Sequence, residues 1–352
     1  MSFESSGSKK DLIKLKVGGV TKLPSKIKES AKSIPRSDCP RTVVRGKKLS
    51  LLSVNVSGLR SLLDPSKDVS RRDAFQKLVK YEKPDLLCLN EHKLQEKHVD
   101  EIKVLLSVLL PEYPVNLQYF TCSTVKKGYS GVAILIRKNS IADIGGKVTA
   151  GYNTSDEIVK TEGRLLTFKA SGLPTVIATY VPNSGQKLDR LQYRCKIWDR
   201  NLSNYIKSLG PSTVVIGDLN CCHLPEDIHN MYSRPNFDDM RRGEIDVIDQ
   251  YKGLSGVAKQ AGLTVEERQS FSKLLKDANM VDTFRQKHPE AVGVFSYYSQ
   301  RAVVNRSLNR GLRLDYVLAS PSLKLADAFI LSRDDVWPFA DHSPIGAIFK
   351  LN

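Results

Sequence analysis

An apolar run that ends in two polar side chains constrains this chain more than any other feature. Thr213-Val214-Val215-Ile216 is typical of a buried strand, and Gly217-Asp218-Leu219-Asn220 follows it directly. Because side chains alternate along extended backbone, Asp218 and Asn220 are expected on the same side of the strand tip. A carboxylate there can orient and deprotonate a water, and a carboxamide can stabilise a charged phosphorus centre. An ordinary turn or helix cap has the same composition, so the motif needs support from elsewhere in the chain.

Other strand-like runs also end in groups that bind metal or phosphate. They span residues 51–54, 85–89 and 176–179, and two motifs near the C-terminal end add acids and a histidine. Ligands of α/β proteins gather outside the strand ends, so the sequence predicts one shared site. Its expected members are Asn55, Glu91, Tyr180, Asn183, Asp218, Asn220, Asp315, Asp341 and His342.

Helical patterns alternate with these strands and indicate the α/β class. They cover residues 72–81, 98–110, 188–208 and 265–278. Thr264, followed three residues later by Glu267, predicts a capping box at the start of the last helix. With 352 residues and 41% hydrophobic content, the chain can form one large domain over residues 49–352. No apolar run is long enough to span a membrane, so a membrane partner is not expected.

The charge of the chain predicts a polyanionic partner, because the formal net charge is +16. Residues 1–48 carry thirteen Lys/Arg against four Asp/Glu and show no sustained apolar period, which predicts a mobile basic extension. A solubilising tail, DNA attachment and a nuclear address are the alternatives for it. A nuclear location is favoured over a mitochondrial one, because acids appear early at Glu4 and Asp11. The six cysteines form no CxxC pair, which favours a reduced intracellular protein without disulfides.

Four further motifs occur in a familiar order. They are Gly128-Tyr129-Ser130-Gly131, Glu162-Gly163-Arg164, Tyr180-Val181-Pro182-Asn183 and Asp341-His342-Ser343-Pro344. With them the chain resembles the exonuclease III type apurinic/apyrimidinic (AP) endonucleases of the endonuclease/exonuclease/phosphatase superfamily, from Leu49 to Leu351. The resemblance implies a DNase I-like fold, a four-layered α/β sandwich with two packed mixed β-sheets flanked by helices. The site is expected at one rim of the sheets.

Chemistry and resemblance together assign roles to the strand-end residues. Glu91 is the expected ligand of Mg²⁺, since a hard cation takes oxygen donors, and the resemblance adds Asp341; Mn²⁺ is the alternative ion. Asp218 is expected to activate the attacking water, with Asn220 orienting it or stabilising the transition state. Asp315 is expected to orient His342, so that the cationic imidazole contacts the scissile phosphate.

The remaining polar residues complete the expected shell. Tyr180 is expected to hydrogen-bond the same phosphate, or to be a core tyrosine at a strand end. Asn55 is expected near the metal, although it could be a plain turn residue. Asn183 is expected on backbone phosphate. His223 is placed in the substrate shell without a defined role.

The chain departs from the family pattern at three places. Ser57 stands where relatives have Asp or Asn, so one group beside the metal is shortened and neutral. Leu312 stands where a Trp is usual in the pocket for a base-free sugar, with Tyr297 and Leu314 as its companions. Residues 231–260 replace a short loop; they are expected to be a tolerated surface insertion, with an effect on substrate access as the alternative.

The expected function is metal-dependent hydrolysis of double-stranded DNA 5′ to an abasic site, by a monomer. The products would be a 3′-hydroxyl and a 5′-deoxyribose phosphate, with 3′-phosphodiesterase and 3′ to 5′ exonuclease work on blocked 3′ ends. The alternatives are an enzyme chiefly for 3′ ends, a catalytically impaired DNA-binding homologue, and another branch of the superfamily such as an inositol phosphatase. The retained acids and His342 argue against an impaired homologue.

Overall fold

The computed structural model describes residues 33–67, 69–140, 145–232, 259–302, 304–331 and 340–351. The first sheet contains β1 (Lys48–Asn55), β2 (Leu86–Asn90), β3 (Gln118–Thr121), β4 (Val132–Ile136), β11 (Leu325–Ile330) and β12 (Ile345–Lys350). The second contains β5 (Lys147–Ala150), β6 (Leu165–Lys169), β7 (Thr175–Tyr180), β8 (Thr213–Asp218), β9 (Val281–Asp282) and β10 (Asp315–Ala319). The α-helices among the described residues are α1 (Leu59–Leu63), α2 (Val69–Glu82), α3 (Val99–Leu109), α4 (Glu157–Thr161), α5 (Leu191–Tyr193), α6 (Asp199–Leu209), α9 (Val265–Asp277), α10 (Thr283–Lys287) and α11 (Val304–Ser307).

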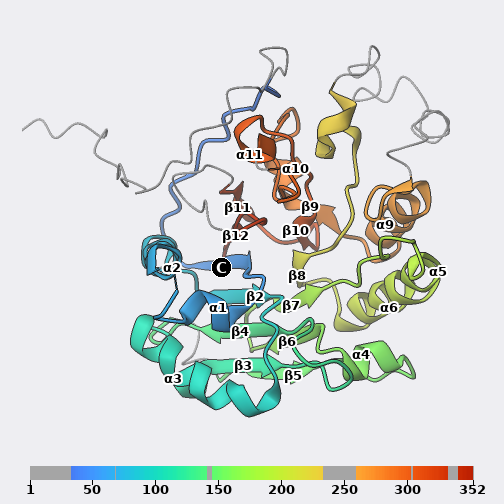
Figure 1. Ribbon diagram of the computed structural model, residues 1–352. Coiled ribbons are helices and arrows are strands. Elements are labelled where there is room, and N and C mark those ends of the chain that lie inside the picture. Colours follow the sequence, from blue (N-terminus) through green and yellow to red (C-terminus); the bar gives the residue numbers. More distant parts are fainter. Residues whose placement is uncertain are drawn as a thin grey trace, which may run out of the picture.

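The two sheets pack face to face between outer helices, which confirms the predicted four-layered sandwich. The strand orders are β11-β12-β1-β2-β4-β3 and β5-β6-β7-β8-β10-β9. In Figure 1, α2 and α3 cover the outer face of the first sheet, and α6 and α9 cover that of the second. Both sheets are mixed, since β1 pairs parallel with β2 and antiparallel with β12, and β8 pairs parallel with β7 and antiparallel with β10.

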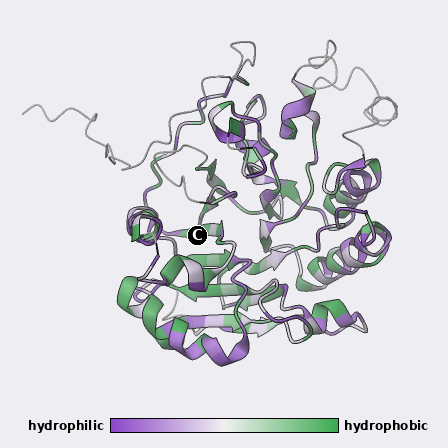
Figure 2. Ribbon diagram, in the orientation of Figure 1, coloured by the Kyte–Doolittle hydropathy of each residue, from purple (hydrophilic) through white to green (hydrophobic). Residues whose placement is uncertain are grey.

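Alternation along the strands divides the hydrophobic residues between the layers. On β1, Leu49 and Leu51 face the core between the sheets, while Leu52 and Val54 pack toward the helices. On β8, Val214 and Ile216 face the same central core and Val215 packs toward α6 and α9. Figure 2 shows the resulting concentration of hydrophobic residues in the strands. A side chain at the end of a strand therefore inherits its face from the residue two positions earlier.

The local features predicted from the helical patterns are confirmed. Each predicted helical segment contains a helix, and residues 188–208 contain α5, the π-helical turn Arg194–Trp198 and most of α6. Thr264 and Glu267 form the capping box at the start of α9. All six cysteines are free thiols. In the part of the chain that the structure describes, no helix is long and apolar enough to cross a membrane.

The predicted basic extension is described only from residue 33 onward. Residues 33–47 contain no helix or strand before the bends that precede β1, yet they contact the domain. Arg41 bonds to Asp327 at 2.7 Å and to Glu82 at 3.0 Å, and its guanidinium lies over the ring of Phe329. This stretch is therefore fixed against the domain, whereas residues 1–32, and 233–258 of the predicted insertion, lie outside the described residues.

Candidate active site

Polar side chains lie at five strand ends on the same rim of the two sheets. Each faces the central core, because an even number of positions separates it from core residues of its own strand. The strand register sets them side by side: Tyr180, Asp218 and Asp315 are neighbours across β7, β8 and β10, and Asn55 is paired with Asn90 across β1 and β2. The predicted convergence of distant stretches is therefore what the fold produces.

Gly217 allows β8 to approach its neighbours closely beside Asp218. Its φ is 143°, and a Cβ atom there would lie 2.0 Å from the carbonyl oxygen of Thr179. The same Cβ would lie 2.9 Å from Nδ2 of Asn90, a residue of the other sheet. A larger residue would force the strand ends apart, so Gly217 sets the width of the site.

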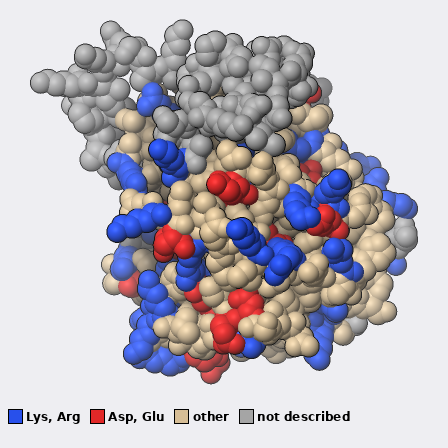
Figure 3. Space-filling view, turned by 90° about the vertical axis from the view of Figure 1, so that its right-hand side faces the viewer, with Lys and Arg blue, Asp and Glu red and all other residues tan. Residues whose placement is uncertain are grey.

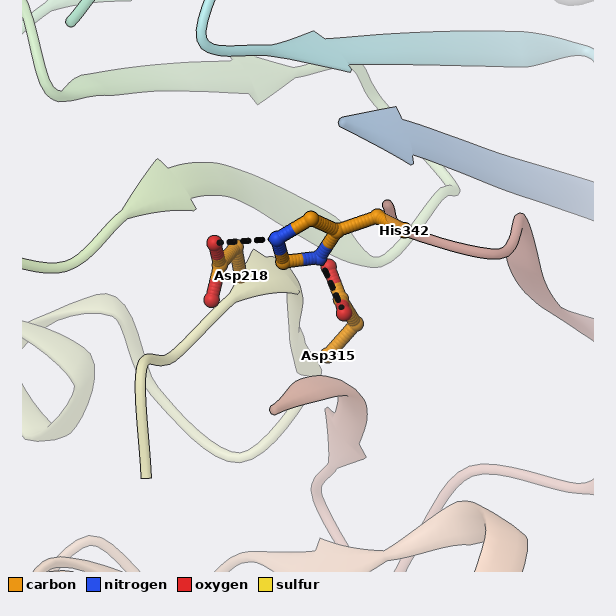
Figure 4. A group of neighbouring side chains, drawn as sticks. All are labelled: Asp218, Asp315 and His342. Carbon is orange, nitrogen blue, oxygen red and sulfur yellow. Dashed lines mark hydrogen bonds and ion pairs between the residues drawn. The ribbon is translucent and has the colours of Figure 1, made fainter. Parts of the chain in front are cut away.

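His342 lies between two buried carboxylates (Figure 4). Its Nδ1 is 2.8 Å from Oδ2 of Asp315, and its Nε2 is 3.7 Å from Oδ2 of Asp218. Ser296 donates from Oγ to the same oxygen of Asp315 at 2.7 Å, so this carboxylate is held from two sides. The predicted pairing of Asp315 with His342 is present in the structure, and Ser296 is a partner that no sequence pattern indicated.

Burial and charge shift the pKa values of this group. Burial raises the pKa of Asp218 to about 7, helped by the negative charge of Asp315 and opposed by His342. Burial alone would lower the pKa of His342, but the carboxylates of Asp315 and Asp218 outweigh it and raise the pKa to about 10. Burial, and then the charges of Glu91 and Asp218, raise the pKa of Tyr180 well above its usual value. At neutral pH the imidazole is cationic and the Tyr180 phenol is protonated, so both can donate hydrogen bonds to an anion.

Two asparagines bond to Asp218, and a third bonds to one of them. Asn55 donates from Nδ2 to Oδ2 of Asp218 at 3.1 Å, and the backbone N–H of Asn220 donates to Oδ1 at 2.9 Å. The Asn220 side chain bonds to the carbonyl of Val181 and accepts from Asn183. Asn220 thus holds Asp218 in place with its backbone, and its predicted contact with water or the transition state stays a prediction.

Acidic groups suited to a divalent cation lie beside this group. The Glu91 side chain is 21% exposed, and its Oε1 is 3.1 Å from Nζ of Lys93, which also donates to Oγ of Ser57. Oδ1 of Asp341 is buried without a hydrogen-bond partner among the described residues, as expected of an oxygen that awaits a cation. Asp218, Asp315 and His342 also offer ligand atoms within 4.8 Å of one another, but their mutual bonds occupy them. Glu91 and Asp341 therefore fit a hard cation better.

The three residues predicted for a sugar pocket are brought together. Tyr297 and Leu312 exchange backbone hydrogen bonds of 2.8 Å, and both pack with Leu314 in one apolar cluster. Ile228 and Met231 belong to the same cluster. The ring of Tyr297 lies 4.9 Å from that of His342 between centroids, so the apolar cluster adjoins the group of Asp218, Asp315 and His342.

The imidazole of His223 is directed toward α9. Its Nε2 is 2.8 Å from Oγ of Ser272, and its ring centroid lies 4.9 Å from that of Phe271. Its backbone N–H bonds to Asp227 and Tyr316. These contacts give His223 a packing role, and its predicted place in the substrate shell stays a prediction.

The fold and the site define a class of protein: a hydrolase with a two-sheet α/β sandwich and an acid, amide and histidine site at one rim. The model of the endonuclease/exonuclease/phosphatase family matches residues 52–336. The chain belongs to this family and, within it, is of the exonuclease III AP endonuclease type. It is therefore an enzyme of a phosphodiester hydrolase group.

Individual relatives agree with this membership. The chain is 33% identical over 308 residues to an exodeoxyribonuclease of Bacillus subtilis, covering 86% of this chain and 100% of that protein. It is 29% identical over 315 residues to a DNA-(apurinic or apyrimidinic site) endonuclease of Dictyostelium discoideum, covering 88% and 73% respectively. The crystal structure of an AP endonuclease from Leishmania major superposes with a TM-score of 0.67 at 28% identity, covering 87% of this chain and 89% of that one.

Proposed function

We propose that this chain cleaves the backbone of double-stranded DNA 5′ to an abasic site, leaving a 3′-hydroxyl and a 5′-deoxyribose phosphate. It also removes blocking groups from 3′ ends. The observation that carries the proposal is the buried group of Asp218, His342 and Asp315, which adjoins an apolar cluster that includes Tyr297 and Leu312. The names of the relatives, which describe exodeoxyribonuclease and AP endonuclease activities, support the choice of DNA as substrate.

Each residue of the buried group has a task in hydrolysis. Asp218 orients a water molecule and accepts its proton, for which a pKa of about 7 is well matched to neutral pH. The Nδ1–H of His342 is held by Asp315, which leaves Nε2–H to donate to an oxygen of the scissile phosphate. Asn55 fixes the second oxygen of Asp218, and the phenol of Tyr180 adds a donor on the neighbouring strand. These fixed donors stabilise the charge that develops on the phosphate.

Glu91 and Asp341 are the residues that would hold Mg²⁺, or Mn²⁺ in its place. When bound there, the ion supplies positive charge to the phosphate and its leaving oxygen. The support is the nature of the donors and the unpaired Oδ1 of Asp341. Both acids act electrostatically on the buried group, Glu91 on Asp218 and Asp341 on His342.

The distribution of charge favours a contribution of the basic extension to DNA binding. On the side formed by α6 and α9, Lys and Arg are interspersed with Asp and Glu and form no single basic patch (Figure 3). Residues 1–48 hold thirteen Lys/Arg and four Asp/Glu out of totals of 54 and 38. We infer that this stretch binds DNA nonspecifically and directs the protein to the nucleus. Replacing the lysines of residues 9–32 by Gln should flatten the salt dependence of DNA binding and leave saturated turnover unchanged.

The central test compares the protein with Asp218→Ala on three labelled duplexes: an internal abasic analogue, a 3′-phosphoglycolate end and an undamaged recessed end. The protein should cut the first two, and Asp218→Ala should lose about 10²–10⁴-fold in turnover. Asp277→Ala is the matched control, because Asp277 is a surface acid of α9 paired with Lys273. Equal cleavage by the protein and Asp218→Ala would remove Asp218 from the mechanism. If the protein cleaves none of the three duplexes, the proposed function is contradicted.

The same duplexes measure the effect of the altered pocket. Leu312 excludes water but stacks less than a Trp would, so we expect a lower preference for internal abasic sites over 3′ ends. Leu312→Trp should raise that preference by about 1 kcal/mol, or roughly fivefold in the ratio of kcat/KM values. An unchanged ratio would show that this position does not set the balance.

A further inference from the structure

A segment that precedes the matched family region is bonded to loops that lead into the candidate active site. The family model begins at residue 52, whereas residues 34–37 lie along the loops at 292–293 and 308–309. The backbone N–H of Ile34 donates to Leu308 at 3.1 Å. Ser37 both donates its N–H to the carbonyl of Val292 and accepts the N–H of Val292 on Oγ, at 2.8 and 2.9 Å. Residues 34–37 are called the strap below.

Gly293 shows how closely the strap is packed. Its φ is 67°, and a Cβ atom there would lie 1.9 Å from the carbonyl oxygen of Pro35. Backbone therefore lies directly on backbone at this point, with no room for a side chain. The strap is therefore closely packed against the loop that carries Ser296 and Tyr297.

Asn309 joins the strap to that loop. Its Nδ2 donates to the carbonyls of Ile34 at 3.2 Å and Gly293 at 2.8 Å, and its Oδ1 accepts from the phenol of Tyr298 at 2.9 Å. Its φ of 51° is in the left-handed region, where Asn is tolerated better than most residues. One side chain thus bonds to three partners, one on the strap and two on the loop at 293–298.

Tyr298 carries the connection to the catalytic turn. Its backbone N–H donates to the carbonyl of Asp341 at 2.8 Å, and its ring lies under the guanidinium of Arg306 at 4.6 Å. Arg306 donates to the carbonyl of Ala340 at 2.7 Å. The turn at 340–342 is therefore bonded to Tyr298, whose phenol Asn309 holds, and to Arg306, which packs on the ring of Tyr298.

We propose that Asn309 and the strap are positioning elements, which fix Tyr298 and through it the Asp341–His342 turn. The inference rests on the proposed function for its kinetic reading. Positioning matters because a displacement of about 1 Å at reacting groups can cost roughly 10²-fold in rate. A segment outside the matched family region thereby contributes to turnover in this chain.

Asn309→Asp in the full chain isolates the connection to the strap. Asp tolerates positive φ and keeps an acceptor for Tyr298, but it loses both donors to Ile34 and Gly293. We expect kcat on the abasic duplex to fall about fivefold, with KM within about twofold, because the effect lies in the transition state. Tyr298→Phe, which keeps the ring and loses the phenol bond to Asn309, is the second variant if Asn309→Asp does not fold.

The control is Gln118→Ala, which removes three hydrogen bonds between β3 and the α3 region, to Lys103, Ser107 and Tyr113. It should lower the melting temperature without changing kcat. Hydrogen–deuterium exchange of a peptide covering 340–350 should be faster in Asn309→Asp and unchanged in Gln118→Ala. If Asn309→Asp loses stability but keeps kcat and the exchange rate, the strap has no positioning role. If the unaltered protein cuts no duplex, the proposed function fails, and the exchange rates still decide the positioning.

Discussion

Two parts of the active site are built in opposite ways. The buried group of Asp218, Asp315, His342 and Ser296 is at most 5% exposed and bonded within itself. The loop group of Ser57, Glu91 and Lys93 is more open, with the Lys93 side chain 35% exposed and the Glu91 side chain 21% exposed. The charges of the buried group are fixed and weakly screened. The charges of the loop group are screened more strongly, because water and ions reach them.

The backbone differs between the groups as well. Ser57, Glu91 and Lys93 all have positive φ, of 46°, 57° and 56°. This conformation costs about 1–2 kcal/mol for each such residue. Nearby hydrogen bonds hold the loop, from Gly58 to the carbonyl of Glu91 and from Lys93 to that of Ser130. The comparison indicates that the buried group supplies preorganised chemistry, while the loop group adjusts to the cation and substrate.

The largest expected effect concerns the buried ion pairs next to the Asp218, Asp315, His342 and Ser296 group. Arg313, two residues before Asp315, makes a buried ion pair with Asp227 at 2.8 Å and with Asp282 at 2.7 Å. Asp227→Asn removes the close carboxylate partner of Arg285 and leaves Arg313 with Asp282 alone. Because a buried charge that loses a partner is costly, the free energy of unfolding should fall by about 3–5 kcal/mol. Urea unfolding at pH 7 measures it.

The pH dependence offers a check of the same ion pair. Burial would raise the pKa of Asp227, but the charges of Arg313 and Arg285 outweigh it and hold the pKa below the usual range. Its stabilising contribution is therefore present above the unfolded pKa of about 3.9 and lost as the pH falls further. The difference between the protein and Asp227→Asn should shrink below about pH 4. A difference in unfolding free energy under 1 kcal/mol at pH 7 would mean that the ion pairs of Asp227 do not stabilise the fold around the buried group.

The second effect separates chemistry from stability within the buried group. Asp315→Asn keeps the shape but loses the charge that orients His342 and holds it cationic. We expect kcat on the abasic duplex to fall about 100-fold, with a much smaller change in KM. Steady-state kinetics measures both, and Asp277→Asn on the surface of α9 is the control. An equal loss in the two variants would contradict the special role of the pair.

Sequence reasoning predicted the buried group better than its surroundings. Asp218 ends a strand-like run, and Asp315 and His342 stand in compact motifs, so residue type and motif were enough to predict that they share one site. Ser296 and Asn309 lie in loops without periodicity, and their roles depend on long-range bonds that only the folded chain shows. The contacts of residues 33–47 were likewise outside the reach of sequence patterns, because contacts such as Arg41 with Asp327 join residues 286 positions apart.

The third effect is a pH dependence of stability from His342. Because Asp315 and Asp218 raise its pKa to about 10, its contribution is fully present below the unfolded pKa of about 6.5 and is lost as the pH rises through 10. The difference in unfolding free energy between the protein and His342→Gln should therefore shrink by at most about 1.4 kcal/mol for each pH unit in that window. Urea unfolding at pH 6, 7.5 and 9 measures it. A difference that grows with pH would show that His342 is neutral in the folded protein.

The smallest expected effect tests the loop group. In the unaltered protein, Lys93 bonds to the neutral Oγ of Ser57 at 3.3 Å and to Glu91 at 3.1 Å. Ser57→Asp places a carboxylate beside this lysine. With a charged partner of its own, Lys93 should compete less with a cation for Glu91. We expect calorimetric titration to show Mg²⁺ binding tightened by about threefold to tenfold, equivalent to about 1 kcal/mol.

Ser57→Asn is the matched control for this change. Asn relieves the positive φ as well as Asp does, but it adds no charge. Equal tightening in both variants would assign the effect to the backbone of the loop. Tightening in Ser57→Asp alone would assign it to the charge balance around Glu91. An unchanged affinity in both would place the cation away from the loop group, and the buried group would then have to bind it without Glu91.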